Sequence, residues 1–128
     1  RSTLFPYTTL FRSNLRNKFI STANGRVFGT WCDLRKGDSF GRVFTHEINP
    51  GTAIFVPKGV ANGYQALDDN IAYTYLVDAH WSPDAKYTFV NLFDPALGID
   101  WPISQDQAII SEKDAQHPLL ANVIPVEV

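Results

Sequence analysis

Short runs of alternating apolar and polar residues fill the chain between residues 18 and 93, and each run ends at a cluster of turn residues. The runs are rich in Val, Ile, Phe, Thr and Tyr, which favour strands. We expect strands in the segments 18–23, 26–34, 40–48, 52–57, 62–67, 71–79 and 86–93. Strands at this short spacing are typical of an antiparallel sandwich or barrel, so the sequence predicts an all-β fold.

The turn residues predict how some of these strands connect. Asn24-Gly25, between the first two runs, is the strongest short signal for a β-hairpin, and it predicts that segments 18–23 and 26–34 pair. No segment before residue 104 has a convincing helical period. We therefore expect residues 14–103 to form one barrel.

Residues 104–128 have a different pattern, and we expect them to lie on the barrel as a short irregular or helical tail. Ser111 followed by Asp114 fits the start of a short helix with a capping-box-like arrangement. Pro118 limits the length of that helix.

The first thirteen residues, RSTLFPYTTLFRS, begin and end with Arg-Ser and show no sustained period of two or of 3.6. They resemble the translation of a sequencing-adapter oligonucleotide, so we expect residues 1–13 to be a foreign leader outside the natural protein, and we leave them out of the fold prediction. The alternative is a native leader. If the leader is foreign, the natural sequence before Asn14 is missing, and with it the amino-terminal strands of the barrel.

Composition narrows the class of protein. A chain of 128 residues suits one domain, and its formal charge of −2 gives no electrostatic reason to expect a nucleic acid or an anionic membrane as partner. The single Cys32 cannot form an intramolecular disulfide, and we expect it to be a small buried apolar residue in a strand. Neither a secretory leader nor a spanning segment is evident, which favours a cytoplasmic protein.

The stretch GTAIFVPKGVANGY, residues 51–64, has the spacing of the second motif of the cupin barrels, but Asn62 stands where a histidine is usual. An amide is a poor ligand for a transition metal compared with imidazole. The histidines, His46, His80 and His117, also lack a compact ligand spacing, so we expect no metal site and no cofactor. Two interpretations of Asn62 stay open, a hydrogen-bonding pocket residue and a turn asparagine with a left-handed backbone.

Farther along, the residues from NGYQALDD to the ending DPALGIDWPI, together with DLRKGDSFG upstream, resemble the carboxyl-terminal half of a dTDP-4-dehydrorhamnose 3,5-epimerase. The resemblance runs from Lys18 to Leu120. It implies a metal-independent cupin jelly roll and an isomerase of rhamnose biosynthesis. Its substrate would be a dTDP-linked 4-keto-6-deoxy sugar, dTDP-4-dehydro-6-deoxy-D-glucose, converted to dTDP-4-dehydro-L-rhamnose.

That reaction requires a base that removes a proton next to the C4 ketone, a group that stabilises the enolate oxygen, and an acid on the opposite face. The resemblance implies that Tyr75 is the acid, that Lys18 faces the carbonyl, and that Asp114 orients a catalytic histidine. Strand alternation places Tyr75 on one face with Tyr73 and Val77, which we expect to be the interior face near Lys18. The alternatives are a core or rim tyrosine, a solvated lysine at a strand end and a surface acid.

The resemblance also implies substrate-binding residues. Trp81 would stack on the nucleotide base, Lys113 would assist with the diphosphate, and Asn62 would line the pocket. The family's basic histidine belongs to an R-G-x-H motif upstream of Lys18, where this chain has Phe11-Arg12-Ser13. We therefore expect an inactive fragment, and the family implies a homodimer with exchanged amino-terminal strands. The segment ISEKDAQHPLLANVIP also resembles the junction in relatives that continue into a reductase domain. The alternative function is a non-catalytic cupin module that binds a sugar nucleotide or mediates assembly.

Overall fold

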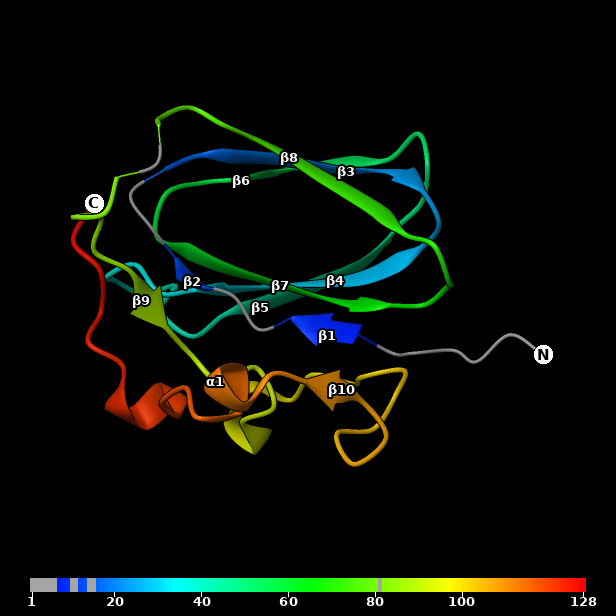
Figure 1. Cartoon of the computed structure of the whole chain (residues 1–128). Coiled ribbons are helices and arrows are strands. Elements are labelled where there is room, and N and C mark those ends of the chain that lie inside the picture. Colours follow the sequence, from blue (N-terminus) through cyan, green and yellow to red (C-terminus); the bar gives the residue numbers. More distant parts are fainter. Residues whose placement is uncertain (1–6, 10–11, 14–15, 81) are drawn as a thin grey trace.

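The computed structural model describes residues 7–9, 12–13, 16–80 and 82–128. Its strands form a five-stranded sheet of order β10-β1-β7-β4-β5, a three-stranded sheet of order β6-β3-β8, and the pair β2-β9. The two larger sheets face each other as two layers (Figure 1), as expected for an all-β fold. The strands are β1 Tyr7–Thr9, β2 Arg12–Ser13, β3 Lys18–Asn24, β4 Val27–Asp33, β5 Val43–Ile48, β6 Ala53–Val56, β7 Val60–Ala66, β8 Ala72–Val77, β9 Thr88–Phe89 and β10 Ile109–Ile110.

The predicted hairpin at Asn24-Gly25 is wrong, because β3 and β4 lie in different sheets. β3 pairs with β6 and β8, whereas β4 pairs with β5 and β7. Gly25 has a φ of 77°, and it turns the chain from one layer into the other. The apolar pattern explains the difference: Ile20 and Val27 are both fully buried in the core between the layers, which requires their strands to face each other.

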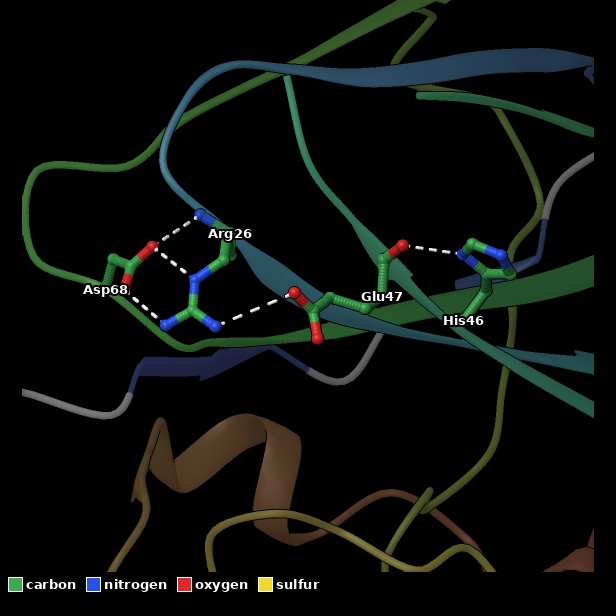
Figure 2. A network of polar contacts seen from close by, with 4 residues as sticks. All are labelled: Arg26, His46, Glu47 and Asp68. Atoms are coloured by element: carbon green, nitrogen blue, oxygen red, sulfur yellow. Dashed lines mark hydrogen bonds and ion pairs between the residues drawn. The ribbon is translucent and has the colours of Figure 1, made fainter. Parts of the chain in front are cut away.

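Arg26 holds this corner through the network in Figure 2. Its guanidinium donates from Nε and Nη2 to both carboxylate oxygens of Asp68, at 3.0 and 2.8 Å, and its backbone N–H donates to Asp68 at 3.0 Å. Its Nη1 lies 3.7 Å from Glu47 of β5. The hydrogen bonds from Arg26 lower the pKa of Asp68. The network thus joins the start of β4 to β5 and to the loop that leads from β7 to β8.

The tail contributes to a second core, on the outer face of the five-stranded sheet. Cys32 and Ala61 pack there against Val123, near the end of the chain. Gln65 Nε2 donates to the carbonyl of Ile103 at 3.0 Å, and its Oε1 accepts from the Ile103 N–H at 2.9 Å. These contacts fix the tail to the barrel, and β10 also pairs in parallel with β1.

Cys32 is fully buried in β4, as predicted. Burial, with smaller contributions from Asp33 and Asp94, raises the pKa of its thiol to about 12. The thiol is therefore protonated at neutral pH, and it is inert as a nucleophile.

Part of the expected leader belongs to the sheets. Tyr7–Thr9 pairs with β7 and β10, and Arg12–Ser13 pairs with β9. Strand pairing by these five residues does not decide where the segment comes from. Backbone N–H and C=O groups form the ladder whatever the side chains are, so an extended segment of any origin can pair with the edge of β7. The foreign origin of residues 1–13 remains a prediction.

Helical structure among the described residues is confined to short turns, and none of it is long and apolar enough to cross a membrane. The helix α1, Glu112–Ala115, starts as predicted, with the Ser111 Oγ accepting from the Asp114 N–H at 3.0 Å. The expected strand 86–93 is mostly wrong, because only Thr88–Phe89 is a strand. The 3-10 helices are η1 Pro95–Leu97 and η2 Leu120–Asn122.

Candidate functional site

A cluster of polar side chains lies between the two sheets, around Asn62 of β7. Asn62 is 3% exposed, and its amide contacts the hydroxyl of Tyr73 at 3.2 Å from Nδ2 and 3.3 Å from Oδ1. The ring of Tyr73 stacks on that of Tyr64 at 4.1 Å. Asn62 lies within a strand, opposite Trp31, and Asn70 is the non-glycine residue with positive φ in the described part of the chain. The left-handed turn interpretation of Asn62 is therefore wrong, and the side chain is an interior hydrogen-bonding group.

Burial raises the pKa of Tyr73, although the hydrogen bond with Asn62 acts in the opposite direction. The phenol is therefore neutral across the physiological range and can both donate and accept a hydrogen bond. Together, Asn62 and Tyr73 present a neutral polar surface inside the sandwich.

Lys18 and Tyr75 lie on the same side of the three-stranded sheet. Lys18 is opposite Val77, and Ile20 is opposite Tyr75. Directly opposed residues project to the same face of a sheet, and Lys18 and Ile20 are buried, at 9% and 0% exposure. The predicted sharing of the interior face by Tyr75 and Lys18 is confirmed.

Tyr75 is nevertheless 59% exposed, which differs from the buried position that we expected. The reason is that β8 is an edge strand of its sheet. It has the strand β3 as a neighbour on one side and no strand of its sheet on the other, so its side chains are open to solvent there. Tyr75 therefore borders the interior at its open side.

Asp114 and Lys113 are on α1, which lies on the other side of the five-stranded sheet from β3 and β8 (Figure 1). The structure does not bring these two residues together with Lys18 and Tyr75. Lys113 is exposed. Trp81, the sixth predicted site residue, lies outside the described residues.

Asp114 has a partner that we did not predict. Its Oδ1 lies 3.1 Å from Nε2 of His117, whose side chain is 7% exposed and whose ring stacks on Phe89 at 4.6 Å. The i, i+3 spacing of Asp114 and His117 at a helix end is the signal that could have identified the pair. Among the described residues, no group of three or more His, Cys, Asp and Glu side chains is arranged to hold a metal ion.

A hollow of about 290 Å³ lies between the edge strands β5 and β6. Its polar wall consists of Arg42 and the pair Asp33 and Arg35, which are joined by hydrogen bonds of 2.9 and 2.7 Å from the guanidinium. Burial would raise the pKa of Asp33, but hydrogen bonds from Arg35 and Ser39 outweigh it, and the pKa is lowered. Trp31 and Phe44 form its aromatic walls, and residues 54–57 of β6 and the turn after it line the opposite side.

Comparison with known proteins identifies relatives along most of the chain. The family model for dTDP-4-dehydrorhamnose 3,5-epimerase matches residues 10–122. A protein of Streptococcus pyogenes serotype M6, described as a protein RmlC homolog, is 46% identical over 114 residues, which are 87% of this chain and 57% of that protein. A dTDP-4-dehydrorhamnose 3,5-epimerase of Mycobacterium tuberculosis is 34% identical over 111 residues, which are 83% of this chain and 54% of that protein. The chain therefore spans just over half the length of these relatives.

Solved structures agree with the sequence relatives. RmlC from Streptococcus suis, in complex with dTDP-D-xylose, superposes with a TM-score of 0.88 at 43% identity, covering 94% of this chain and 63% of that one. RmlC from Legionella pneumophila, in complex with dTDP-4-keto-L-rhamnose, superposes with a TM-score of 0.80 at 25% identity, covering 91% and 64%. These likenesses confirm the expected jelly-roll fold of the cupin type.

Proposed function

Because the chain belongs to the dTDP-4-dehydrorhamnose 3,5-epimerase family, we propose that it is the barrel region of an isomerase that inverts C3 and C5 of dTDP-4-dehydro-6-deoxy-D-glucose. The product would be dTDP-4-dehydro-L-rhamnose. Two relatives whose structures hold a dTDP-sugar support this class of substrate. We also propose a cytoplasmic location, where a free thiol such as that of Cys32 stays reduced.

The observation that supports this proposal is that Lys18, Asn62 and Tyr75 all project to the interior side of the two layers. The Lys18 ammonium would offset the negative charge that develops on the C4 oxygen, and it is more effective in a buried site than in water. The Tyr75 hydroxyl would donate a proton to the carbon from the face opposite the base. The Asn62 amide would donate or accept a hydrogen bond at a sugar hydroxyl.

The remaining roles are proposals that the family suggests. Asp114 would orient a histidine, but in the structure it already holds His117 on the outer side of the five-stranded sheet. Its proposed role therefore either places two histidines on one carboxylate or requires Asp114 to exchange partners. Trp81 and Lys113 would bind the base and the diphosphate of the nucleotide.

The position of the histidines favours the second candidate function for the chain as it stands, a non-catalytic cupin module that binds a sugar nucleotide or mediates assembly. His117 is paired with Asp114, and His46 contacts the Glu47 carbonyl at 2.6 Å on β5. His80 is exposed beyond the end of β8. A base would have to act from the face of the sugar opposite Tyr75, and the hydrogen bonds of His46 and His117 hold these two rings to the Glu47 carbonyl and to Asp114 instead.

The family also suggests two features of assembly. A homodimer that exchanges amino-terminal strands would complete each barrel, and a reductase domain could follow in a longer chain. Both remain predictions.

Deuterium uptake at C3 and C5 of the substrate in heavy water tests the proposed chemistry. A chimera in which the aligned amino-terminal part of the Streptococcus pyogenes relative replaces residues 1–13 should exchange both positions. The chain as given should be slower by about 10²–10⁴-fold, the usual contribution of a general base. Equal rates would place the base within this chain, and no exchange by a folded chimera would contradict the epimerase proposal.

A further inference from the structure

The hollow between the edge strands β5 and β6 is separate from the proposed reaction site. β5 ends the five-stranded sheet and β6 ends the three-stranded sheet, so no ladder of the described strands joins the two layers on this side. Lys18, Asn62 and Tyr75 are not among the residues that line it. Its volume of about 290 Å³ is close to the lower limit of small-molecule pockets, about 300 Å³. The hollow can therefore hold a small organic molecule for which the proposed reaction has no use.

Most of the wall of the hollow is apolar. Trp31 is 4% exposed and Phe44 is 56% exposed, so a buried ring and an exposed ring both line it. The centroids of these two rings are 5.5 Å apart, and their planes are inclined by 31°. Ile54 and Val56 line the side that β6 contributes. Neighbouring aromatic rings with aliphatic side chains opposite them favour a flat apolar ligand.

The carboxylate of Asp33, which also lines the hollow, is already supplied with donors. It accepts from the backbone N–H and two guanidinium N–H groups of Arg35, and from the Ser39 hydroxyl at 2.8 Å. A carboxylate has about four acceptor positions, so these hydrogen bonds occupy them. The guanidinium of Arg35 also balances the charge of Asp33. This pair therefore offers little to a cation or to a donor group of a ligand.

Two other polar groups of the wall are donors without an acceptor. Arg42 is exposed, and within the part of the chain that the structure describes its guanidinium has no ion pair or hydrogen bond. The indole N–H of Trp31 is buried, and no described residue accepts from it. A ligand that suits this wall therefore carries acceptors, and the uncompensated charge of Arg42 favours an anion.

We propose that this hollow binds a planar aromatic carboxylate, with its ring against Trp31 and Phe44 and its carboxylate on the guanidinium of Arg42. A guanidinium and a carboxylate meet through two parallel N–H···O bonds, which fix the direction of the ligand as well as its charge. Removal of the ring and the apolar wall from water supplies affinity, and Arg42 selects the anion. The site does not depend on the proposed epimerase activity.

Isothermal titration calorimetry of the 128-residue chain with 2-naphthoate tests the site. The neutral isostere 2-naphthamide keeps the shape and should bind about tenfold more weakly, because a charge-assisted hydrogen-bonded pair is lost. Arg42→Ala should weaken the binding of 2-naphthoate by about tenfold and change that of 2-naphthamide much less. Lys58→Ala is the matched control, because Lys58 is an exposed cation in the turn after β6 that does not line the hollow. It should bind 2-naphthoate like the unaltered chain.

The indole N–H signal of Trp31 in a heteronuclear NMR spectrum locates the ligand without any change to Arg42. Trp31→Phe identifies the signal by its loss, and 2-naphthoate should shift it in a saturable way in the unaltered chain. Circular dichroism checks that each variant is folded. The proposal is overturned by a lack of saturable binding, by equal affinities for 2-naphthoate and 2-naphthamide, by equal losses in Arg42→Ala and Lys58→Ala, or by a Trp31 signal that does not move.

Discussion

Asn62 shows how a single substitution in a motif changes what a position does. An imidazole there would offer a metal ligand, whereas the amide is 3% exposed and exchanges hydrogen bonds with the Tyr73 hydroxyl. The stacked rings of Tyr64 and Tyr73 hold that hydroxyl in place. Around Asn62, the interior is therefore a network of neutral hydrogen-bonding groups.

Replacing Asn62 with alanine should destabilise the protein. The Tyr73 hydroxyl would lose its partner inside the sandwich, and an unsatisfied buried polar group costs about 1–3 kcal/mol. Urea denaturation gives the free energy of unfolding. The matched comparison is Asn62→Ala in a Tyr73→Phe background, where the loss should be smaller. Equal losses in the two backgrounds would show that the hydrogen bond contributes nothing.

At the scale of elements, the turn after β4 is stabilised by one carboxylate. Asp33 accepts from Arg35 through its backbone N–H at 2.9 Å and through the guanidinium, and from the Ser39 hydroxyl at 2.8 Å. Gly59, in the turn before β7, lies against the Arg35 side chain with a φ of 80°. The turn after β4 and the turn before β7 are therefore in contact through the Arg35 side chain.

Asp33→Asn should lower stability by about 1–3 kcal/mol near neutral pH, because the backbone N–H and two guanidinium N–H groups of Arg35 lose a charged acceptor. The pKa of Asp33 is lowered in the folded state. The stabilisation that the Asp33 carboxylate provides is therefore fully present above the unfolded-state pKa of about 3.9, and it is lost as the pH falls through the pKa of the folded state. The free energy of unfolding, measured from pH 7 down to acid, should decline less steeply for Asp33→Asn than for the unaltered chain. Asp38→Asn, exposed in the same loop, is the control, and an identical decline in the two variants would contradict this account.

Gly59→Ala should destabilise more than Gly51→Ala. Both positions have a positive φ, which costs roughly 1–2 kcal/mol for a residue with a Cβ. At Gly59 the added Cβ would also lie 2.6 Å from the Arg35 Cγ, and Arg35 cannot move without losing Asp33, whereas nothing lies within 4 Å at Gly51. Thermal unfolding compares the two variants. Equal shifts would mean that Arg35 is free to move.

The sequence predicted elements better than it predicted their pairing. The alternation in segments such as 18–23 and 71–79 located β3 and β8, because burial of one face requires that pattern. Asn24-Gly25 was misread, since the turn chemistry of a hairpin and that of a corner between sheets is the same. The choice between them depends on which core each strand enters, and that is a tertiary property.

For the candidate site, too, the sequence predicted what depends on the local pattern and missed what depends on tertiary structure. The face shared by Lys18 and Tyr75 followed from the period of two and was confirmed. The exposure of Tyr75 could not follow from it, because it depends on β8 being at the edge of a sheet. The partner of Asp114 is a residue three positions away, His117, and we missed it by expecting a histidine upstream.

At the scale of the whole molecule, the tail covers the outer face of the five-stranded sheet, and Tyr75 borders the interior at the open edge of β8. Within the part of the chain that the structure describes, the outer face of the three-stranded sheet keeps large apolar side chains exposed. This arrangement suits a barrel whose interior is reached past β8. The proposed chemistry assigns different faces of the sugar to different residues: a base on one side, and Tyr75 as acid on the other.

The measurement that tests this assignment most directly is Tyr75→Phe in the active chimera, with deuterium uptake and inversion at C3 and C5 followed separately by NMR. Phenylalanine keeps the ring and removes the proton donor. The base can still remove a proton and return a deuteron to the same face, so uptake should persist while inversion falls by about 10²–10⁴-fold. Inversion at the rate of the unaltered chimera would show that Tyr75 is not the acid, and that the interior face shared by Lys18 and Tyr75 is not where the reaction takes place.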